Sequence, residues 1–429
     1  MNGIETDQDD QDRHLAGGRP RGRPRIALYS PGMVGLGHMR RHLLIAQTLL
    51  CSRLRPIILM IAESREAGAF MTPPGMDFLT MPALAKDSDG RCRPRHLDIP
   101  LEDLVGLREN AIAAALEAFE PDVLIVDHLP RGALRELNPA LEYLRSRGRT
   151  RCVLGLRDVL GDRRTITQRW RRDANDEAIR DYYDAVWVYG DPVVYDAIRE
   201  YRFPPDVAAK MCYTGYFDQL TRLRFAQVEH SDPVAALGLP TGRLALCLVG
   251  GGQDGARLAE TFVHVELPPD TNAVIVTGPF MPPEAQQRLR EHAARRPSLR
   301  VLHFVTEPAL LLRQADRVIA MGGYNTVCEV LSFEKPSLIV PRARRAPEQL
   351  IRAERLRRMG LVEVLHPDDV SPHLLGEWLA CPKEPPRARD RIDFNGLSRV
   401  TELLEEMLVG HLRPAPARPH EERSQNVAP

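Results

Sequence analysis

The sequence predicts an α/β protein built from two doubly wound domains, each a parallel sheet with helices on both faces. Three observations indicate this architecture. The chain has 429 residues, which is enough for two domains with separate cores. Short apolar runs alternate with segments of helical periodicity, as they do in consecutive βα units. Glycine-rich turns follow an apolar run in both halves, and open α/β sheets bind ligands at such turns.

Composition argues against several other classes of protein. The formal net charge is zero, so charge gives no reason to expect binding to nucleic acid or to an anionic membrane. No apolar run approaches the roughly 18–20 residues of a membrane span, so we expect a soluble protein, with peripheral membrane contact left open. The seven cysteines are scattered, and several lie in apolar runs. We therefore expect free thiols in a reducing cytoplasm.

The first half begins with a polar segment, residues 1–24, which we expect to be a disordered tail. Residues 25–216 then form the expected N-terminal domain, in which a helix from Leu101 to Phe119 precedes the fourth strand and residues 84–98 form a polar loop. The expected strands are Arg25–Pro31, Pro56–Ala62, Met76–Met81, Asp122–Asp127, Val153–Leu156, Ala185–Tyr189 and Met211–Thr214.

A glycine-rich turn joins the first strand to the first helix, and His38 stands at the start of that helix. The turn does not have the GxGxxG pattern, and no suitably placed acid follows it, so it does not predict a dinucleotide site. Asp127 ends the fourth strand and should face the same crevice as His38, where the two could pair as a base and its carboxylate. A structural cap is the alternative for each residue.

The second half begins after residues 217–242, where weak periodicity and Pro, Gly and Asp punctuation indicate a linker. Residues 243–410 form the expected C-terminal domain, whose last helix could return to the first domain, and residues 411–429 should be disordered. The expected strands are Leu244–Val249, Ala273–Thr277, Arg300–Phe304, Ala315–Ala320 and Ser337–Pro341, and the expected helices include Arg352–Met359, Leu374–Leu379 and Leu397–Leu408.

The stretch from Gly322 to Glu329 combines three features of a nucleotide site. Two glycines turn an apolar strand into a helix, whose first amides and dipole favour an anion. Asn325 and Thr326 add side-chain donors, and the carboxylate of Glu329 suits a pair of vicinal hydroxyls. Phosphate donors followed by a diol acceptor describe the phosphates and ribose of a nucleotide. An ordinary glycine-capped βα turn is the alternative.

At these residues the chain resembles the GT-B glycosyltransferases, and in particular their MurG-like family 28 branch. The Gly322–Glu329 stretch is similar to the family's nucleotide-sugar signature, and Glu348-Gln349 to its acid–Gln pair for the donor sugar. The triple-glycine turn at residues 250–257 resembles MurG's Gly-Gly-Ser-Gln-Gly-Ala-Arg, with one residue inserted. Met321 replaces a phosphate-binding His of many members, which the MurG-like branch also lacks, and residues 342–345 add a basic insert.

The resemblance implies a GT-B fold, in which two Rossmann-like domains face each other across a cleft. The first would bind the acceptor, and the second the nucleotide sugar. His38 and Asp127 would be catalytic. The implied donor-binding residues are Gly251, Gly252, Gln253, Val305, Gly322, Gly323, Asn325, Thr326, Glu329, Glu348 and Gln349.

The activity that this resemblance implies is inverting transfer of a hexose from a nucleotide sugar, with a UDP-sugar as the expected donor, to an acceptor hydroxyl of unknown identity. No acidic metal-binding pair stands out, so we expect neither an essential metal nor a cofactor. A PseG-like nucleotide-sugar hydrolase, a sugar 2-epimerase and a non-catalytic GT-B partner protein are the alternatives. The presence of His38, Glu329 and Gln349 argues against the non-catalytic alternative.

Overall fold

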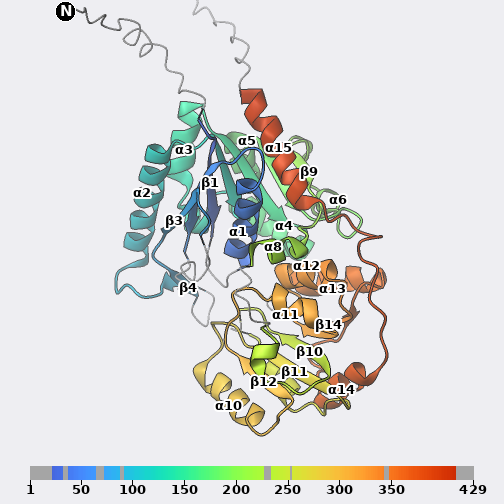
Figure 1. Ribbon diagram of the computed structural model, residues 1–429. Coiled ribbons are helices and arrows are strands. Elements are labelled where there is room, and N and C mark those ends of the chain that lie inside the picture. Colours follow the sequence, from blue (N-terminus) through green and yellow to red (C-terminus); the bar gives the residue numbers. More distant parts are fainter. Residues whose placement is uncertain are drawn as a thin grey trace, which may run out of the picture.

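A computed structural model of the chain describes residues 22–31, 37–63, 72–86, 91–226, 233–251, 254–342 and 347–411. Two parallel sheets, each flanked by helices, lie one above the other in Figure 1. This arrangement confirms the predicted pair of doubly wound α/β domains. None of the helices in these ranges is both long and apolar enough to cross a bilayer. The seven cysteines are all free, as expected.

The first sheet has seven strands, and the chain winds outward from its centre in both directions. Its spatial order is β3 (Met76–Thr80), β2 (Ile57–Ala62), β1 (Arg25–Ser30), β6 (Val123–Asp127), β7 (Arg151–Arg157), β8 (Ala185–Tyr189) and β9 (Met211–Tyr213). Because β1 pairs with β2 on one side and with β6 on the other, the switch point of the sheet lies between β1 and β6.

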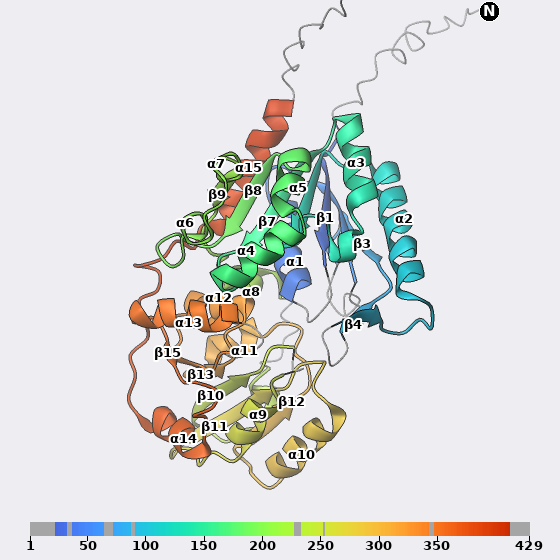
Figure 2. The same ribbon diagram turned by 180° about the vertical axis from the view of Figure 1, so that it is seen from behind.

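Alternating side chains of β1 enter two separate cores. Ile26 and Leu28 pack on the face covered by α1 (Gly37–Leu50) and α15 (Gly396–His411). Ala27 and Tyr29 pack on the opposite face, which Figure 2 shows from behind. The helices of that face include α2 (Leu101–Phe119), α3 (Asn138–Arg147), α4 (Arg163–Arg172), α5 (Asn175–Tyr182), α6 (Ala197–Tyr201) and α7 (Pro205–Ala208).

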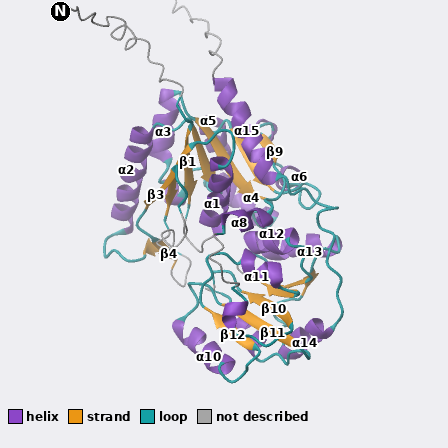
Figure 3. Cartoon of the chain, in the orientation of Figure 1, coloured by secondary structure: helices purple, strands orange, loops and turns teal. Residues whose placement is uncertain are grey.

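The second sheet has six strands in the order β12 (Leu299–Leu302), β11 (Thr271–Val276), β10 (Arg243–Leu248), β13 (Arg317–Ala320), β14 (Ser337–Ile339) and β15 (Glu363–Val364). Its switch point lies between β10 and β13, which pair in parallel. Figure 3 shows helices on both of its faces. One face packs against α9 (Ala256–Val263), α10 (Pro283–Ala293) and α14 (Pro372–Ala380), the other against α11 (Ala309–Gln314), α12 (Tyr324–Ser332) and α13 (Pro347–Arg358).

The polar loop expected over residues 84–98 is wrong in part, because it contains the antiparallel strands β4 (Leu84–Lys86) and β5 (Cys92–Pro94). Leu84 is fully buried against Leu104 and Ala133, and its amide donates to Glu63 Oε1 at 2.7 Å. Each of these strands has only three residues, which is too short for an alternating pattern to be recognised in the sequence.

Two segments connect the domains, and they lie side by side. The outgoing segment follows β9 and leads through α8 (Arg222–Phe225) toward β10. The returning segment leads to α15, which packs on α1, so the chain does make the return that the sequence left open. The amide of Tyr216 donates to Asp393 O at 2.8 Å, and the amide of Gly396 donates to Tyr216 O at 3.1 Å. Phe217 and Asn395 complete an antiparallel bridge between the two segments.

Candidate active site

His38 and Asp127 meet at the switch point of the first sheet. His38 is the second residue of α1, and Asp127 is the last residue of β6, the strand beside β1. His38 Nδ1 lies 2.8 Å from Asp127 Oδ2. The His38 side chain is 21% exposed, whereas Asp127 is completely buried. The structure thus places in direct contact the two residues that the sequence predicted to share a crevice.

Arg41, one turn after His38 on α1, holds the same carboxylate. Its Nη2 donates to both oxygens of Asp127, at 2.8 and 2.5 Å, and lies 3.1 Å from His38 Nδ1. Two N–H groups cannot donate to each other, so the arginine hydrogen goes to the carboxylate and the Nδ1 proton of His38 also points to Asp127. This tautomer leaves Nε2 as the imidazole nitrogen with a free lone pair.

The electrostatics keep His38 neutral and Asp127 charged. Burial lowers the pKa of His38, and Arg41 adds to this, while the nearby Asp127 partly opposes it. Burial alone would raise the pKa of Asp127, but Arg41 and His38 hold it well below its usual value. A neutral, partly exposed imidazole with an ionised carboxylate on its far nitrogen is the arrangement that a general base requires.

The glycine turns of the second domain lie at its own switch point. Gly250 and Gly251 follow β10, while Gly322 and Gly323 follow β13, and the two strands are neighbours. Gly250 has a φ of 65°, which favours glycine. A Cβ on Gly322 would come within 3.1 Å of Ile339 Cγ2, whereas a Cβ on Gly323 would meet nothing within 4 Å.

Two of the predicted donor-binding residues lie outside the described part of the chain, namely Gly252 and Gln253. Val305 lies in the segment between β12 and α11 and is partly buried. Glu348 and Gln349 lie in the first turn of α13. Gln349 is 5% exposed, and its Oε1 accepts from the amide of Arg342 at 3.0 Å.

The residues of α12 that were predicted to bind phosphate and ribose contact the first domain in this structure. Asn325 Nδ2 donates to the carbonyl of Gly37 at 2.9 Å. Glu329 Oε1 lies 3.0 Å from Arg40 Nη2, and its side chain is only 2% exposed. Thr326, by contrast, is partly exposed. The carboxylate expected to accept the ribose hydroxyls is therefore already paired, with an arginine from the start of α1.

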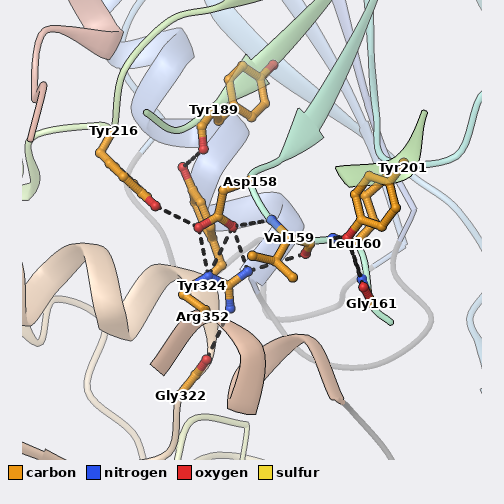
Figure 4. A network of polar contacts seen from close by, with 10 residues as sticks. All are labelled: Asp158, Val159, Leu160, Gly161, Tyr189, Tyr201, Tyr216, Gly322, Tyr324 and Arg352. Atoms are coloured by element: carbon orange, nitrogen blue, oxygen red, sulfur yellow. Dashed lines mark hydrogen bonds and ion pairs between the residues drawn. The ribbon is translucent and has the colours of Figure 1, made fainter. Parts of the chain in front are cut away.

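A buried polar network joins the two domains beside this site (Figure 4). Asp158 follows β7, and its Oδ1 accepts from Arg352 Nη2 of α13 at 2.6 Å. Asp158 Oδ2 also accepts from the hydroxyl of Tyr216 at 2.7 Å. Tyr324, the first residue of α12, donates its hydroxyl to the carbonyl of Tyr189 at 2.8 Å. These contacts fix the carboxyl edge of the first sheet against the starts of α12 and α13.

Sequence reasoning missed the network and also Arg41. Asp158 and Arg352 are 194 positions apart, and neither belongs to a recognisable motif. The chain is so rich in arginine that no single one stands out. For Arg41 a signal was present, because a residue three positions after His38 on a helix lies on the same face.

Known proteins resemble the chain at two levels, and the first is sequence. Residues 246–390 match the family model of the glycosyltransferase family 28 C-terminal domain. An uncharacterized glycosyltransferase of Methanosarcina acetivorans is 22% identical over 239 residues, which cover 53% of this chain and 55% of that protein. The UDP-N-acetylglucosamine–N-acetylmuramyl-(pentapeptide) pyrophosphoryl-undecaprenol N-acetylglucosamine transferase of Opitutus terrae is 29% identical over 124 residues, covering 28% and 33%. The chain thus spans about half or less of the length of these relatives.

The second level is structure. MurG of Acinetobacter baumannii superposes with a TM-score of 0.53 at 16% identity, covering 89% of this chain and 99% of that one. The calicheamicin glycosyltransferase CalG4 superposes with a TM-score of 0.58 at 14% sequence identity, and the superposition covers 91% of this chain and 100% of that one. The UDP-GlcNAc 2-epimerase of Neisseria meningitidis, solved with bound UDP-GlcNAc, superposes with a TM-score of 0.57 at 12% sequence identity. The superposition covers 90% of this chain and 100% of that one. These likenesses confirm the predicted GT-B fold. The family match confirms the MurG-like, family 28 resemblance over the domain that holds Gly251 to Gln349.

Proposed function

We propose that this protein is an inverting, metal-independent glycosyltransferase that moves a sugar from a nucleotide diphosphate sugar, most simply a UDP-sugar, to an acceptor hydroxyl. The observation that carries the proposal is the contact between His38 and Asp127 at the switch point of the first sheet. Its second support is the family 28 match, which covers the second domain and both of its glycine turns.

The first domain supplies the base. His38 Nε2 takes the proton of the acceptor hydroxyl while the acceptor oxygen forms its bond to the anomeric carbon. Asp127 holds the ring by accepting from Nδ1 and stabilises the imidazolium that forms. Arg41 keeps Asp127 ionised, so the proton stays on the imidazole and does not pass to the carboxylate.

The second domain stabilises the leaving group. As the bond from the anomeric carbon to the phosphate oxygen breaks, the electron pair passes to the nucleoside diphosphate. The amides at the start of α12 and the turn at Gly250 and Gly251 are suited to this charge. In this proposal the side chains of Asn325 and Thr326 donate hydrogen bonds to the diphosphate. Val305 contacts the nucleobase, and Glu329 accepts hydrogen bonds from the ribose hydroxyls. Glu348 and Gln349 bind the donor sugar.

The test is a screen of the full chain against UDP-, dTDP-, GDP- and ADP-sugars by thermal shift, followed by assays of product formation with and without candidate acceptors. Transfer that persists in EDTA and inverts the anomeric configuration supports the proposal. Retention of configuration would overturn the base mechanism. Free sugar formed at the same rate with and without acceptors would indicate that His38 activates water, as in a nucleotide-sugar hydrolase.

A further inference from the structure

Among the described residues, two side chains near His38 each have a buried nitrogen atom with no hydrogen-bond partner. His128 directly follows Asp127, and its ring lies 5.5 Å from the ring of His38, centroid to centroid. Its backbone is left-handed, with a φ of 70°, which is uncommon for a residue with a side chain. Arg157 ends β7, the next strand of the sheet. His128 Nδ1 and Arg157 Nε are both buried, and neither has a hydrogen-bond partner within the part of the chain that the structure describes.

The position of Arg157 is set by its neighbour in sequence. Asp158 is held by Arg352, which is one turn after Glu348 on α13. The end of β7 is therefore fixed against the first turns of α13. The amide of His128 donates to the carbonyl of Gly155 at 2.8 Å, and Gly155 and Arg157 are alternate residues of β7, so Arg157 lies at the same edge of the sheet as His128. Electrostatic coupling of Arg157 to His128 and to Glu348 agrees with this position. A group bound to Arg157 would lie beside the ring pair of His38 and His128, at the edge of the sheet that contacts α13.

Arg157 is less closely paired than the other arginines of this region. Arg41 is neutralised by Asp127, and Arg352 by Asp158. No carboxylate in the part of the chain that the structure describes forms an ion pair with Arg157. Burial lowers the pKa of Arg157; the carboxylates of Glu348 and Asp127 oppose this shift, and the positive charges of Arg41 and Arg352 add to it. Leaving the buried Nε donor of Arg157 without an acceptor costs free energy, which a bound anion would offset.

We propose that Arg157 and His128 form an anion subsite that receives a carboxylate or phosphate of the acceptor, close to its reacting hydroxyl. The inference rests on the proposed function and narrows it to acidic acceptors. The diphosphate of the donor has its own candidate amides in the glycine turns of the second domain. The anion bound beside His38 is therefore assigned to the acceptor, which is the substrate whose hydroxyl gives its proton to His38.

The first experiment measures binding of inorganic phosphate to the full chain by calorimetry, in the presence of saturating UDP. The wild type should bind phosphate without displacing UDP. Arg157→Met should weaken this binding about tenfold or more, because it loses a charge-assisted contact, whereas Arg157→Lys should retain part of it. Arg163→Met removes an exposed arginine of α4 and is the matched control, which should bind phosphate as the wild type does.

Phosphate binding that is equal in the wild type and Arg157→Met, or that is absent from both, would overturn the subsite. Competition between phosphate and UDP would overturn it too, because the anion would then occupy the donor site. Failure of UDP itself to bind would count against the proposed function, while the phosphate titration would still report on Arg157. The two failures are thus distinguishable.

The second experiment assigns the anion to acceptor or donor. UDP-glucuronate and UDP-glucose are titrated into the wild type and Arg157→Met. The proposal expects the ratio of their affinities to be the same in both proteins, since the acid group of the sugar does not reach Arg157. A selective loss of UDP-glucuronate affinity in Arg157→Met would place the anion on the donor sugar and overturn the assignment to the acceptor.

Discussion

The ion pair between Arg40 and Glu329 predicts an unusual mutational effect, in which removal of a charge tightens ligand binding. If Glu329 accepts the ribose hydroxyls, the donor must first displace Arg40 from it. Replacing Arg40 with Met removes the competing cation and leaves the apolar part of the side chain in place. Arg40→Met should therefore bind UDP more tightly than the wild type.

The magnitude follows from the geometry. At 3.0 Å the attraction between the two charges is about 5 kcal/mol for an effective dielectric constant of about 20. Most of this is offset, because both groups are largely withdrawn from water, with side-chain exposures of 13% and 2%. Arg40 Nη2 also lies 3.5 Å from Oε1 of a second carboxylate, Glu307, so Arg40 remains paired when it leaves Glu329. A net cost of about 1–2 kcal/mol for opening the pair corresponds to a five- to thirtyfold gain in UDP affinity.

Calorimetric titration of UDP into the wild type, Arg40→Met and Glu329→Ala tests this reasoning. Glu329→Ala removes the acceptor of the ribose hydroxyls and should weaken binding, so the two variants should move in opposite directions. Arg40→Met leaves Glu329 without its ion-pair partner and should lower the melting temperature; equal or weaker UDP binding by Arg40→Met, measured where the variant is folded, would refute the competition between Arg40 and the ribose. Unchanged affinity in Glu329→Ala would refute the ribose contact.

Four further predictions concern the dyad, the network and the glycine turn. His38→Ala should lower turnover by roughly 10²–10⁴-fold with donor affinity nearly unchanged, and Asp127→Asn should lower turnover by less. If His38→Ala kept the turnover of the wild type, His38 could not be the general base. Because the pKa of His38 is lowered, the acid limb of the pH profile of kcat/KM should lie below pH ~6.5. The charge of Asp127 raises the pKa of His38, so Asp127→Asn should move this limb to still lower pH. Arg352→Met should cost about 3–5 kcal/mol in urea unfolding, because it leaves a buried carboxylate unpaired, while the exposed Arg357→Met should change stability by about 0.5 kcal/mol or less. Gly323→Val should fold normally, since its Cβ meets open space, and should lose UDP binding by obstructing the turn; normal UDP affinity would show that the turn is only a connector.

Local patterns were sufficient for the architecture because each βα unit carries its own signal. The run before Gly322 is apolar, and the residues after it have helical spacing, whatever the rest of the chain does. The same reasoning placed His38 and Asp127 at one edge, since the carboxyl ends of parallel strands share that edge.

The partners of the candidate site residues could not be predicted in this way. Glu329 pairs with Arg40 across nearly 290 positions, and the sequence contains no signal that selects this arginine among its many others. Docking of the two domains decides that contact, as it decides the pairing of Asp158 with Arg352. Patterns in a single sequence indicate individual helices and strands, whereas these contacts depend on how the folded domains pack against each other.

The two paired connecting segments make the second domain an insertion between β9 and α15 of the first. A domain held by one tether can swing in any direction. Here the two connecting segments are hydrogen-bonded to each other through Tyr216, Asp393 and Gly396, so together they define one hinge axis between the domains. Such a hinge permits rotation about its own axis and resists sliding and twisting. If the two domains separate, we therefore expect a rotation about this axis, and that rotation must also break the ion pair between Asp158 and Arg352.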